Sequence, residues 1–295
     1  MRNDQEVIEH LLARAVGKKD KRKIGLIIQG GGMRGAFSSG AAQGLDDVGL
    51  TDCFDYIYAS SSGSCAAAYL LSGQIQKAGS IYWNHLYGLG FIRPWRLSKI
   101  MDLDYLCDDL FRNQYRLNRK RLRDSKTLLK VYLTESETGR SEFITNRDKD
   151  DMVSAIKASC SLPSYYPKPV SLRGRVYYDG NVGKALPFEE ALRDGCTDLL
   201  VIATISENAK DSPFLNYFLS FGFKSKLREM VKTRTLNYQE NVEMIFGRKR
   251  KLQGLDIYTI SPHKSISKAE VRRWVLEKTG MKGRESVLRA FGRIK

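Results

Sequence analysis

Two segments near the N-terminus repeat one order of features: a short apolar run, a turn of glycine or serine residues, and a longer run of small and apolar residues. They occupy residues 24–49 and 54–73. A short apolar run bounded by turn residues is typical of a buried strand, and a small-residue run that ends at glycine is typical of a helix. Helices and strands that alternate along a chain pack as layers around a sheet. The sequence therefore predicts an α/β fold with a largely parallel sheet.

The rest of the chain is predicted to add strands first and helices afterwards. Residues 129–145 have the pattern of a hairpin, and residues 175–180 and 199–206 have that of further strands. The strand-rich part is predicted to end near residue 206, where the chain becomes polar, basic and mostly helical in pattern. We therefore expect an N-terminal helix and hinge at residues 1–22, a main domain at residues 23–205, and a basic C-terminal segment or subdomain at residues 206–295.

The chain is strongly basic. Its formal net charge is +16, from 49 Lys and Arg against 33 Asp and Glu. Clustered Lys and Arg are attracted to dense phosphate, so nucleic acid and anionic lipid surfaces both fit as partners. No zinc-finger spacing or aromatic RNA-binding signature accompanies the charge. We therefore expect peripheral contact with an anionic membrane surface rather than nucleic-acid binding.

The cysteines and the N-terminal composition limit the class of protein further. The five cysteines are scattered without any C-x-x-C pair, which argues against a disulfide framework or a zinc site. We expect no metal and no cofactor. The apolar runs fall far short of the roughly 20 residues of a membrane-spanning helix, and residues 1–23 lack the apolar core of a signal peptide. These features favour a cytoplasmic location, with peripheral contact at the inner face of the membrane.

A glycine-rich turn, GGGMRG, follows the first predicted strand at residues 30–35. Glycine permits unusual backbone angles, and a helix N-terminus offers unpaired N–H groups, so such a turn can hold a phosphate or stabilise an oxyanion. The turn also matches the dinucleotide pattern G-x-G-x-x-G, with Asp52 or Asp55 as the acid. Both acids precede the second strand instead of ending it, which disfavours a dinucleotide site. A turn that serves only close packing is another alternative.

A second turn, ASSSG at residues 59–63, also lies between a predicted strand and a predicted helix. It matches G-x-S-x-G with alanine in the first position and places Ser61 at the centre, where small neighbours allow the tight turn of a nucleophile. The alternative is a serine-rich cap of the helix that begins near Ser64. A third motif, YDGN, places Asp179 after a short strand; by itself an Asp-Gly pair indicates only a turn.

Together these motifs resemble the patatin-like phospholipase family, whose marks are G-G-G-x-R-G, G-x-S-x-G and D-G-G or D-G-A in this order. Residues 156–170, IKASCSLPSYYPKPV, resemble the family's small residues followed by proline and aromatics. The resemblance covers residues 23–205. It implies a three-layer α/β/α catalytic domain there. The chain departs from the pattern at Gln29, Ala59 and Asn181.

The resemblance also implies a mechanism. Ser61 is the nucleophile, Asp179 is its general base without a histidine, and Gly30, Gly31, Gly32 and Arg34 form the oxyanion hole, with the amides of Gly31 and Gly32 as donors. The substrate is a fatty-acyl ester, expected to be a phospholipid or a lysophospholipid. A carboxylate is a weak base for a hydroxyl, so we expect Asp179 to be partly buried.

Two alternatives remain open on the sequence alone. His263 is the one histidine that follows Asp179, so a Ser61, Asp179 and His263 triad is possible in chain order. The chain could also be a catalytically weak or silent relative that binds membranes or nucleic acid through its basic surface. Two stretches are relevant to surface binding: the basic residues 111–126 and the aromatic residues Trp83, Tyr87, Phe91 and Trp95, which could form a lid.

Overall fold

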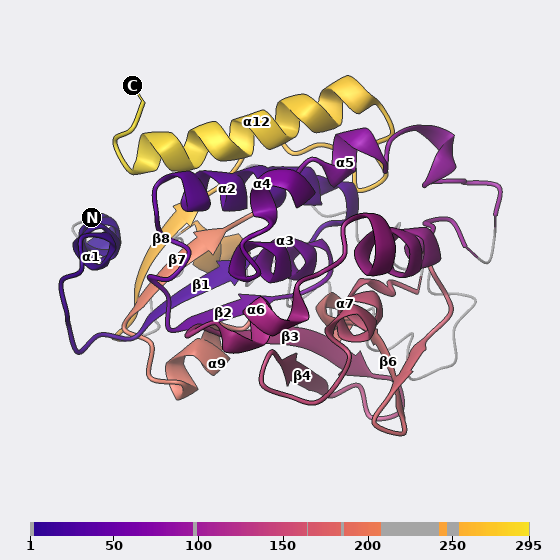
Figure 1. The fold of residues 1–295 in the computed structure, drawn as a ribbon, viewed down its shortest axis with the longest axis horizontal. Helices are drawn as coiled ribbons and strands as arrows, with labels where there is room; N and C mark the ends of the chain where they lie inside the picture. Colours follow the sequence, from indigo (N-terminus) through magenta and orange to yellow (C-terminus); the bar gives the residue numbers. More distant parts are fainter. Residues whose placement is uncertain are drawn as a thin grey trace.

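One mixed sheet forms the centre of the protein (Figure 1). The computed structural model describes residues 3–96, 99–163, 165–183, 186–207, 242–246 and 254–294. The sheet order is β5-β6-β3-β2-β1-β7-β8, with β4 also paired to β3. The strands are β1 (Ile24–Ile28), β2 (Tyr56–Ala59), β3 (Leu128–Glu135), β4 (Ser141–Thr145), β5 (Val170–Leu172), β6 (Arg175–Asp179), β7 (Asp198–Ile202) and β8 (Asp256–Ile260).

The neighbouring strands β3, β2, β1, β7 and β8 run parallel, and the antiparallel pairs lie at the β5 end of the sheet. Parallel pairing joins β3 to β2, β2 to β1, β1 to β7 and β7 to β8. Antiparallel pairing joins β3 to β4, β3 to β6 and β5 to β6. The β3–β4 pair is the predicted hairpin. The predicted α/β fold with a mainly parallel sheet is confirmed.

Helices cover the sheet. Among the described residues, none of these helices is long and apolar enough to cross a membrane. They are α1 (Asn3–Ala15), α2 (Gly35–Asp47), α3 (Ser62–Leu71), α4 (Ile75–Ala78), α5 (Ile81–Asn84), α6 (Arg119–Asp124), α7 (Met152–Cys160), α8 (Gly180–Gly183), α9 (Phe188–Arg193) and α12 (Arg273–Ala290), with the 3-10 turns η1 (Gly32–Arg34) and η2 (Gly88–Gly90) and the π-helix η3 (Tyr105–Gln114).

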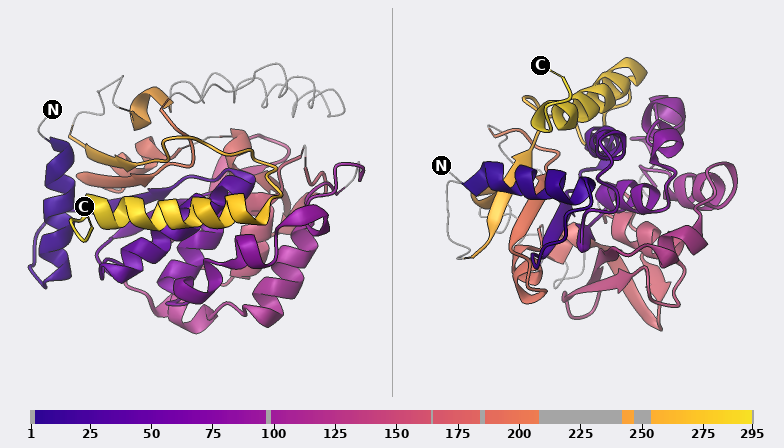
Figure 2. Two further views of the ribbon diagram at one scale, coloured as in Figure 1. Left: turned by 90° about the horizontal axis from the view of Figure 1, so that it is seen from above. Right: turned by 60° about the vertical axis from the view of Figure 1, so that its left-hand side comes forward.

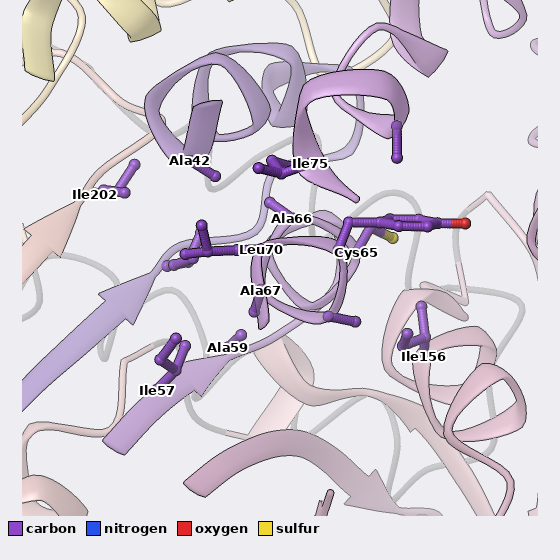
Figure 3. Close-up of a cluster of buried hydrophobic side chains, with 14 of the residues drawn as sticks. Ala42, Ile57, Ala59, Cys65, Ala66, Ala67, Leu70, Ile75, Ile156 and Ile202 are labelled. Carbon is purple, nitrogen blue, oxygen red and sulfur yellow. The ribbon is translucent and has the colours of Figure 1, made fainter. Parts of the chain in front are cut away.

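Both faces of the sheet are buried, in two separate apolar clusters. In β1, Leu26 and Ile28 belong to the cluster under α2, α3 and α12, whereas Ile27 belongs to the cluster that includes Phe188 of α9. Successive side chains of a strand point to opposite faces, so one apolar strand supplies both clusters. The three layers α/β/α follow from this alternation. Figure 3 shows part of the larger cluster, where Ala67 of α3 lies toward Ile57 and Ala59 of β2, and Ala66 lies toward Ala42 of α2.

The C-terminal residues extend the layers of the preceding chain. β8 pairs parallel with β7, from Asp198 opposite Asp256 to Ile202 opposite Ile260. α12 lies along α2 on one face of the sheet, as Figures 1 and 2 show. β8 lies beyond residue 206, where the strand-rich part was predicted to end; its half-exposed, mixed sequence at the edge of the sheet did not indicate a strand. The division of the chain near residue 206 stays a prediction, and residues 208–241 lie outside the described residues.

Candidate active site

Ser61 lies in a sharp turn between the end of β2 and the start of α3. Its backbone angles are φ 52° and ψ −135°, a region that residues with a side chain rarely adopt. The turn fits because Gly63 has no Cβ, which would overlap the carbonyl oxygen of Ile28. This strained strand-to-helix turn presents the serine at the carboxyl edge of the sheet, as in a nucleophile elbow.

The turn is held by Ser159, at the end of α7. The amide of Ser61 donates to Ser159 Oγ at 2.8 Å, and Ser159 Oγ donates to the carbonyl oxygen of Tyr132 in β3 at 2.7 Å. Ser159 is fully buried. Sequence reasoning missed this role, although the small residues of the 156–170 segment were a signal that something packs closely there.

The glycine turn lies directly against Ser61. A Cβ on Gly30 would come within 2.6 Å of Ser61 Cβ, so only glycine allows this approach. Gly32 has a φ of 59°, which glycine adopts without strain. The amide of Gly31, which was predicted to be an oxyanion donor, instead donates to Ser62 Oγ at 2.9 Å. Within the described residues, no protein acceptor is recorded for the amide of Gly32.

The C-terminal part of the chain holds the turn from its other side. The amide of Met33 donates to the carbonyl oxygen of Lys268 at 3.0 Å, and Arg34 Nε donates to that of Ile266 at 2.8 Å. Lys268 also lines the cleft beside the turn. Residues after β8 are therefore part of the site, which the sequence did not indicate.

Asp179 lies at the end of β6 and is 1% exposed, more deeply buried than expected. Its Oδ1 accepts from the amide of Asn181 at 2.8 Å and from Asn181 Nδ2 at 3.0 Å. Asn181 Oδ1 in turn accepts from Ser60 Oγ at 2.9 Å. Asn181, a departure from the family pattern, thus connects the aspartate to the serine turn. The sequence did not indicate this connection.

Ser61 and Asp179 line one cleft with Gly30, Gly31, Gly32 and Arg34. The cleft encloses about 900 Å³, counted with the space open to solvent. Most of its other walls are apolar or aromatic: Met33, Leu86, Phe91, Met101, Leu103, Leu106, Leu162, Tyr165 and Ile205. Burial raises the pKa of the Tyr82 phenol well above its usual range, which keeps this further wall residue neutral. The cleft therefore offers an apolar space beside a serine and a carboxylate.

The histidines lie away from this constellation. His263 is exposed and is absent from the described residues that line the cleft. His10 contacts Asp198 at 2.7 Å, and His85 contacts Tyr115 at 3.0 Å. The geometry therefore does not favour the triad with His263.

The acids of the dinucleotide alternative lie at the wrong end of the sheet. Asp55 Oδ2 accepts from Arg14 and from the amide of Ile24, both at 2.8 Å, at the amino ends of β1 and β2. The glycine turn follows the carboxyl end of β1. Because a ribose would have to contact both features, the arrangement does not fit a dinucleotide.

The other predicted stretches divide between core and surface. Of the four proposed lid aromatics, Phe91 lines the cleft, Trp83 packs against the core, and Tyr87 and Trp95 are exposed. Within residues 111–126, Arg112 and Arg119 form ion pairs with Asp151, so part of the basic stretch is neutralised. Among the described residues, no cluster of three His, Cys, Asp or Glu side chains has an arrangement that could hold a metal ion.

A serine in a strained turn, a buried carboxylate and an apolar cleft at the carboxyl edge of a parallel sheet are the features of an α/β serine hydrolase. A family model of the patatin-like phospholipases matches residues 26–192, more than half of the chain. The chain belongs to this family, which confirms the resemblance seen in the motifs. Membership points to a lipid acyl hydrolase or esterase in general.

Individual relatives are distant. The chain is 26% identical over 258 residues to the uncharacterized protein YjjU of Escherichia coli (strain K12), a match that covers 83% of this chain and 71% of that protein. Among solved structures it is similar to VipD from Legionella pneumophila, with 13% identity and a TM-score of 0.47 over 92% of this chain and 67% of that one.

Proposed function

We propose that this protein hydrolyses fatty-acyl esters of phospholipids or lysophospholipids, with Ser61 as nucleophile and Asp179 as general base. One observation carries the proposal: Ser61, in a strained turn, and the buried Asp179 line the same apolar cleft. Strain of this kind persists where the surrounding structure maintains it for function.

The reaction is a double displacement. Ser61 Oγ attacks the ester carbonyl while Asp179 takes the hydroxyl proton, and the C–O bond to the alcohol breaks as Asp179 returns that proton to the leaving oxygen. Water then attacks the acyl-Ser61 ester, again losing a proton to Asp179. Ser61 leaves with that proton, and the fatty acid is released.

The glycine turn supports the oxyanion in this proposal. The Gly32 amide is the donor best placed to act, because no protein acceptor is recorded for it among the described residues, while the Gly31 bond to Ser62 fixes the turn. Arg34 adds positive charge at the same wall of the cleft. A preorganised donor stabilises the charge that develops on the carbonyl oxygen.

The apolar walls support a fatty-acyl substrate. Leu86, Phe91 and Leu106 are buried side chains that line the cleft next to Ser61. Burying methylene groups against such walls is favourable by about 0.8 kcal/mol each. We place the reaction at the inner, cytoplasmic face of the membrane, where anionic lipids attract a chain with a net charge of +16.

The test is fatty-acid release from mixed phospholipid vesicles by the wild type and by Ser61→Ala, Asp179→Asn and His263→Ala, each checked for folding by circular dichroism. We expect Ser61→Ala and Asp179→Asn to lose about 10³-fold or more in kcat/KM, and His263→Ala to match the wild type. A fluorophosphonate probe should add its mass to the peptide that contains Ser61. Loss of activity in His263→Ala would replace the dyad with a triad, and an inactive, unlabelled wild type would make the protein a silent relative.

A further inference from the structure

The rim of the cleft carries exposed apolar side chains. In the rim segment, residues 86–96, Tyr87 is 42%, Leu89 is 53% and Trp95 is 64% exposed. Single exposed apolar residues are ordinary on a protein surface, but several on one short segment beside a cleft indicate an interaction site.

The rim segment also forms part of the cleft wall. Leu86 and Phe91 are buried and line the cleft, whereas Tyr87, Leu89 and Trp95 face solvent. One stretch of chain therefore joins the space beside Ser61 to the outer surface. A partner that binds the exposed side lies at the entrance of the cleft.

The start of α12 extends this surface. The amide of Gly88 donates to the carbonyl oxygen of Val271 at 2.7 Å, and the guanidinium of Arg273 lies 5.5 Å from the ring centre of Tyr87. Trp274, the next residue, is 63% exposed. Figure 1 shows this end of α12 beside α5, at the end of the molecule toward which β1 and β2 point.

The charge on this surface is basic. Arg93 and Arg273 have no carboxylate within ion-pair distance in the described part of the chain. The acids nearby are already paired: Asp102 with Lys99 at 2.6 Å, and Glu270 with Arg272 at 2.7 Å. Aromatic rings surrounded by arginines are typical of surfaces that enter the headgroup region of an anionic bilayer.

We propose that the rim segment and the first turn of α12 together dock the protein on an anionic lipid bilayer, with Tyr87, Leu89, Trp95 and Trp274 inserted and Arg93 and Arg273 on the lipid phosphates. The proposal rests on the proposed function, because the docked surface would open the cleft toward the membrane. A lipid could then move from the bilayer to Ser61 without crossing water.

The experiment separates docking from catalysis. Docking is measured by co-sedimentation of the full chain carrying Ser61→Ala with vesicles of phosphatidylcholine alone or mixed with phosphatidylglycerol. Catalysis is measured with the wild-type chain on a short-chain p-nitrophenyl ester in solution. The apolar variant is Leu89→Ser with Trp95→Ser, and the charge variant is Arg93→Gln with Arg273→Gln. The matched control is Val16→Ser, which removes an apolar side chain that is 75% exposed on the N-terminal segment.

We expect the apolar variant to bind mixed vesicles at least about tenfold more weakly than the control. The charge variant should lose about as much, and only on vesicles with phosphatidylglycerol. Introduced into the active chain, each variant should hydrolyse the soluble ester like the wild type. The proposed docking surface is wrong if both variants bind vesicles like Val16→Ser. It is also wrong if sedimentation velocity shows that the patch joins two copies of the chain and that the variants separate them. An inactive wild type that still docks would refute the proposed function and leave the surface intact.

Discussion

At the scale of single residues, Ser159 connects three elements at the turn that contains Ser61. It belongs to α7, accepts from the amide of Ser61 after β2, and donates to the carbonyl oxygen of Tyr132 in β3. Without its hydroxyl, both backbone groups would be left unpaired in a buried place, which costs about 1–3 kcal/mol. The strained conformation of Ser61 therefore depends on a residue that does not line the cleft.

We predict that Ser159→Ala lowers kcat about 10- to 100-fold, as expected when a catalytic group is displaced by a small distance, and leaves KM nearly unchanged. The matched control is Ser161→Ala. The Ser161 hydroxyl is equally buried, but it donates to the carbonyl oxygen of Lys157, only four residues earlier in the chain. Steady-state kinetics on a soluble ester and urea unfolding measure the two effects. Equal kcat values for the two variants would show that Ser159 has no positioning role.

Local motifs singled out Ser61, Asp179 and the glycine turn, because each motif depends on neighbours in sequence, and the structure brings the three into one cleft. Ser159, Asn181 and Lys268 could not be predicted in the same way. Their roles come from contacts between distant segments, such as the Lys268 carbonyl that accepts from Met33. No periodicity or spacing in one sequence reports such pairings.

At the scale of elements, the contact between α2 and α12 is unusually close. A Cβ on Gly40 would overlap the carbonyl oxygen of Gly280, and a Cβ on Gly283 would overlap that of Phe37. These overlaps involve backbone atoms, which cannot move aside as a flexible side chain can. The glycines therefore set the distance between the two helices and, through it, the place of the segment that holds the glycine turn.

We predict that Gly40→Ala lowers the free energy of unfolding by about 2–4 kcal/mol, in the upper range of overpacking effects. Gly90→Ala is the matched control, because a Cβ there meets nothing within 4 Å. Urea denaturation followed by circular dichroism measures both variants. A loss below about 1 kcal/mol for Gly40→Ala would mean that α12 shifts freely along α2.

The elements themselves were predictable to different degrees. Every residue of β1 and β7 is buried, and apart from Asp198 at the start of β7 neither strand contains a polar side chain, so composition identifies them. β8 is half-exposed along most of its length and carries polar residues, so it lacks both the continuous and the alternating pattern of a strand. It becomes a strand because β7 offers a free edge, which is a property of the folded sheet.

At the scale of the whole molecule, the excess of positive charge makes the few acids important. Hydrogen bonding with Arg272 lowers the pKa of Glu270 to about 2, and hydrogen bonding with Arg14 lowers the pKa of Asp20 to about 2. A carboxyl whose pKa is lowered by folding binds protons more readily in the unfolded chain. Its stabilising effect is therefore complete above the unfolded pKa and is lost as the pH falls from there toward the folded value.

We predict that the free energy of unfolding falls steadily below about pH 5, where these carboxyls begin to bind protons in the unfolded chain. Acidification also adds to the net charge of +16, and the resulting repulsion acts in the same direction.

Urea unfolding at a series of pH values should show that Glu270→Gln destabilises the protein at neutral pH and that its difference from the wild type shrinks on acidification. Glu277→Gln, at an exposed position of α12, is the matched control and should follow the wild-type curve. The pH dependence comes from the charged carboxylate alone. If the difference in free energy of unfolding between Glu270→Gln and the wild type stays constant from pH 7 to the acid limit of folding, the ion pair with Arg272 adds nothing to stability.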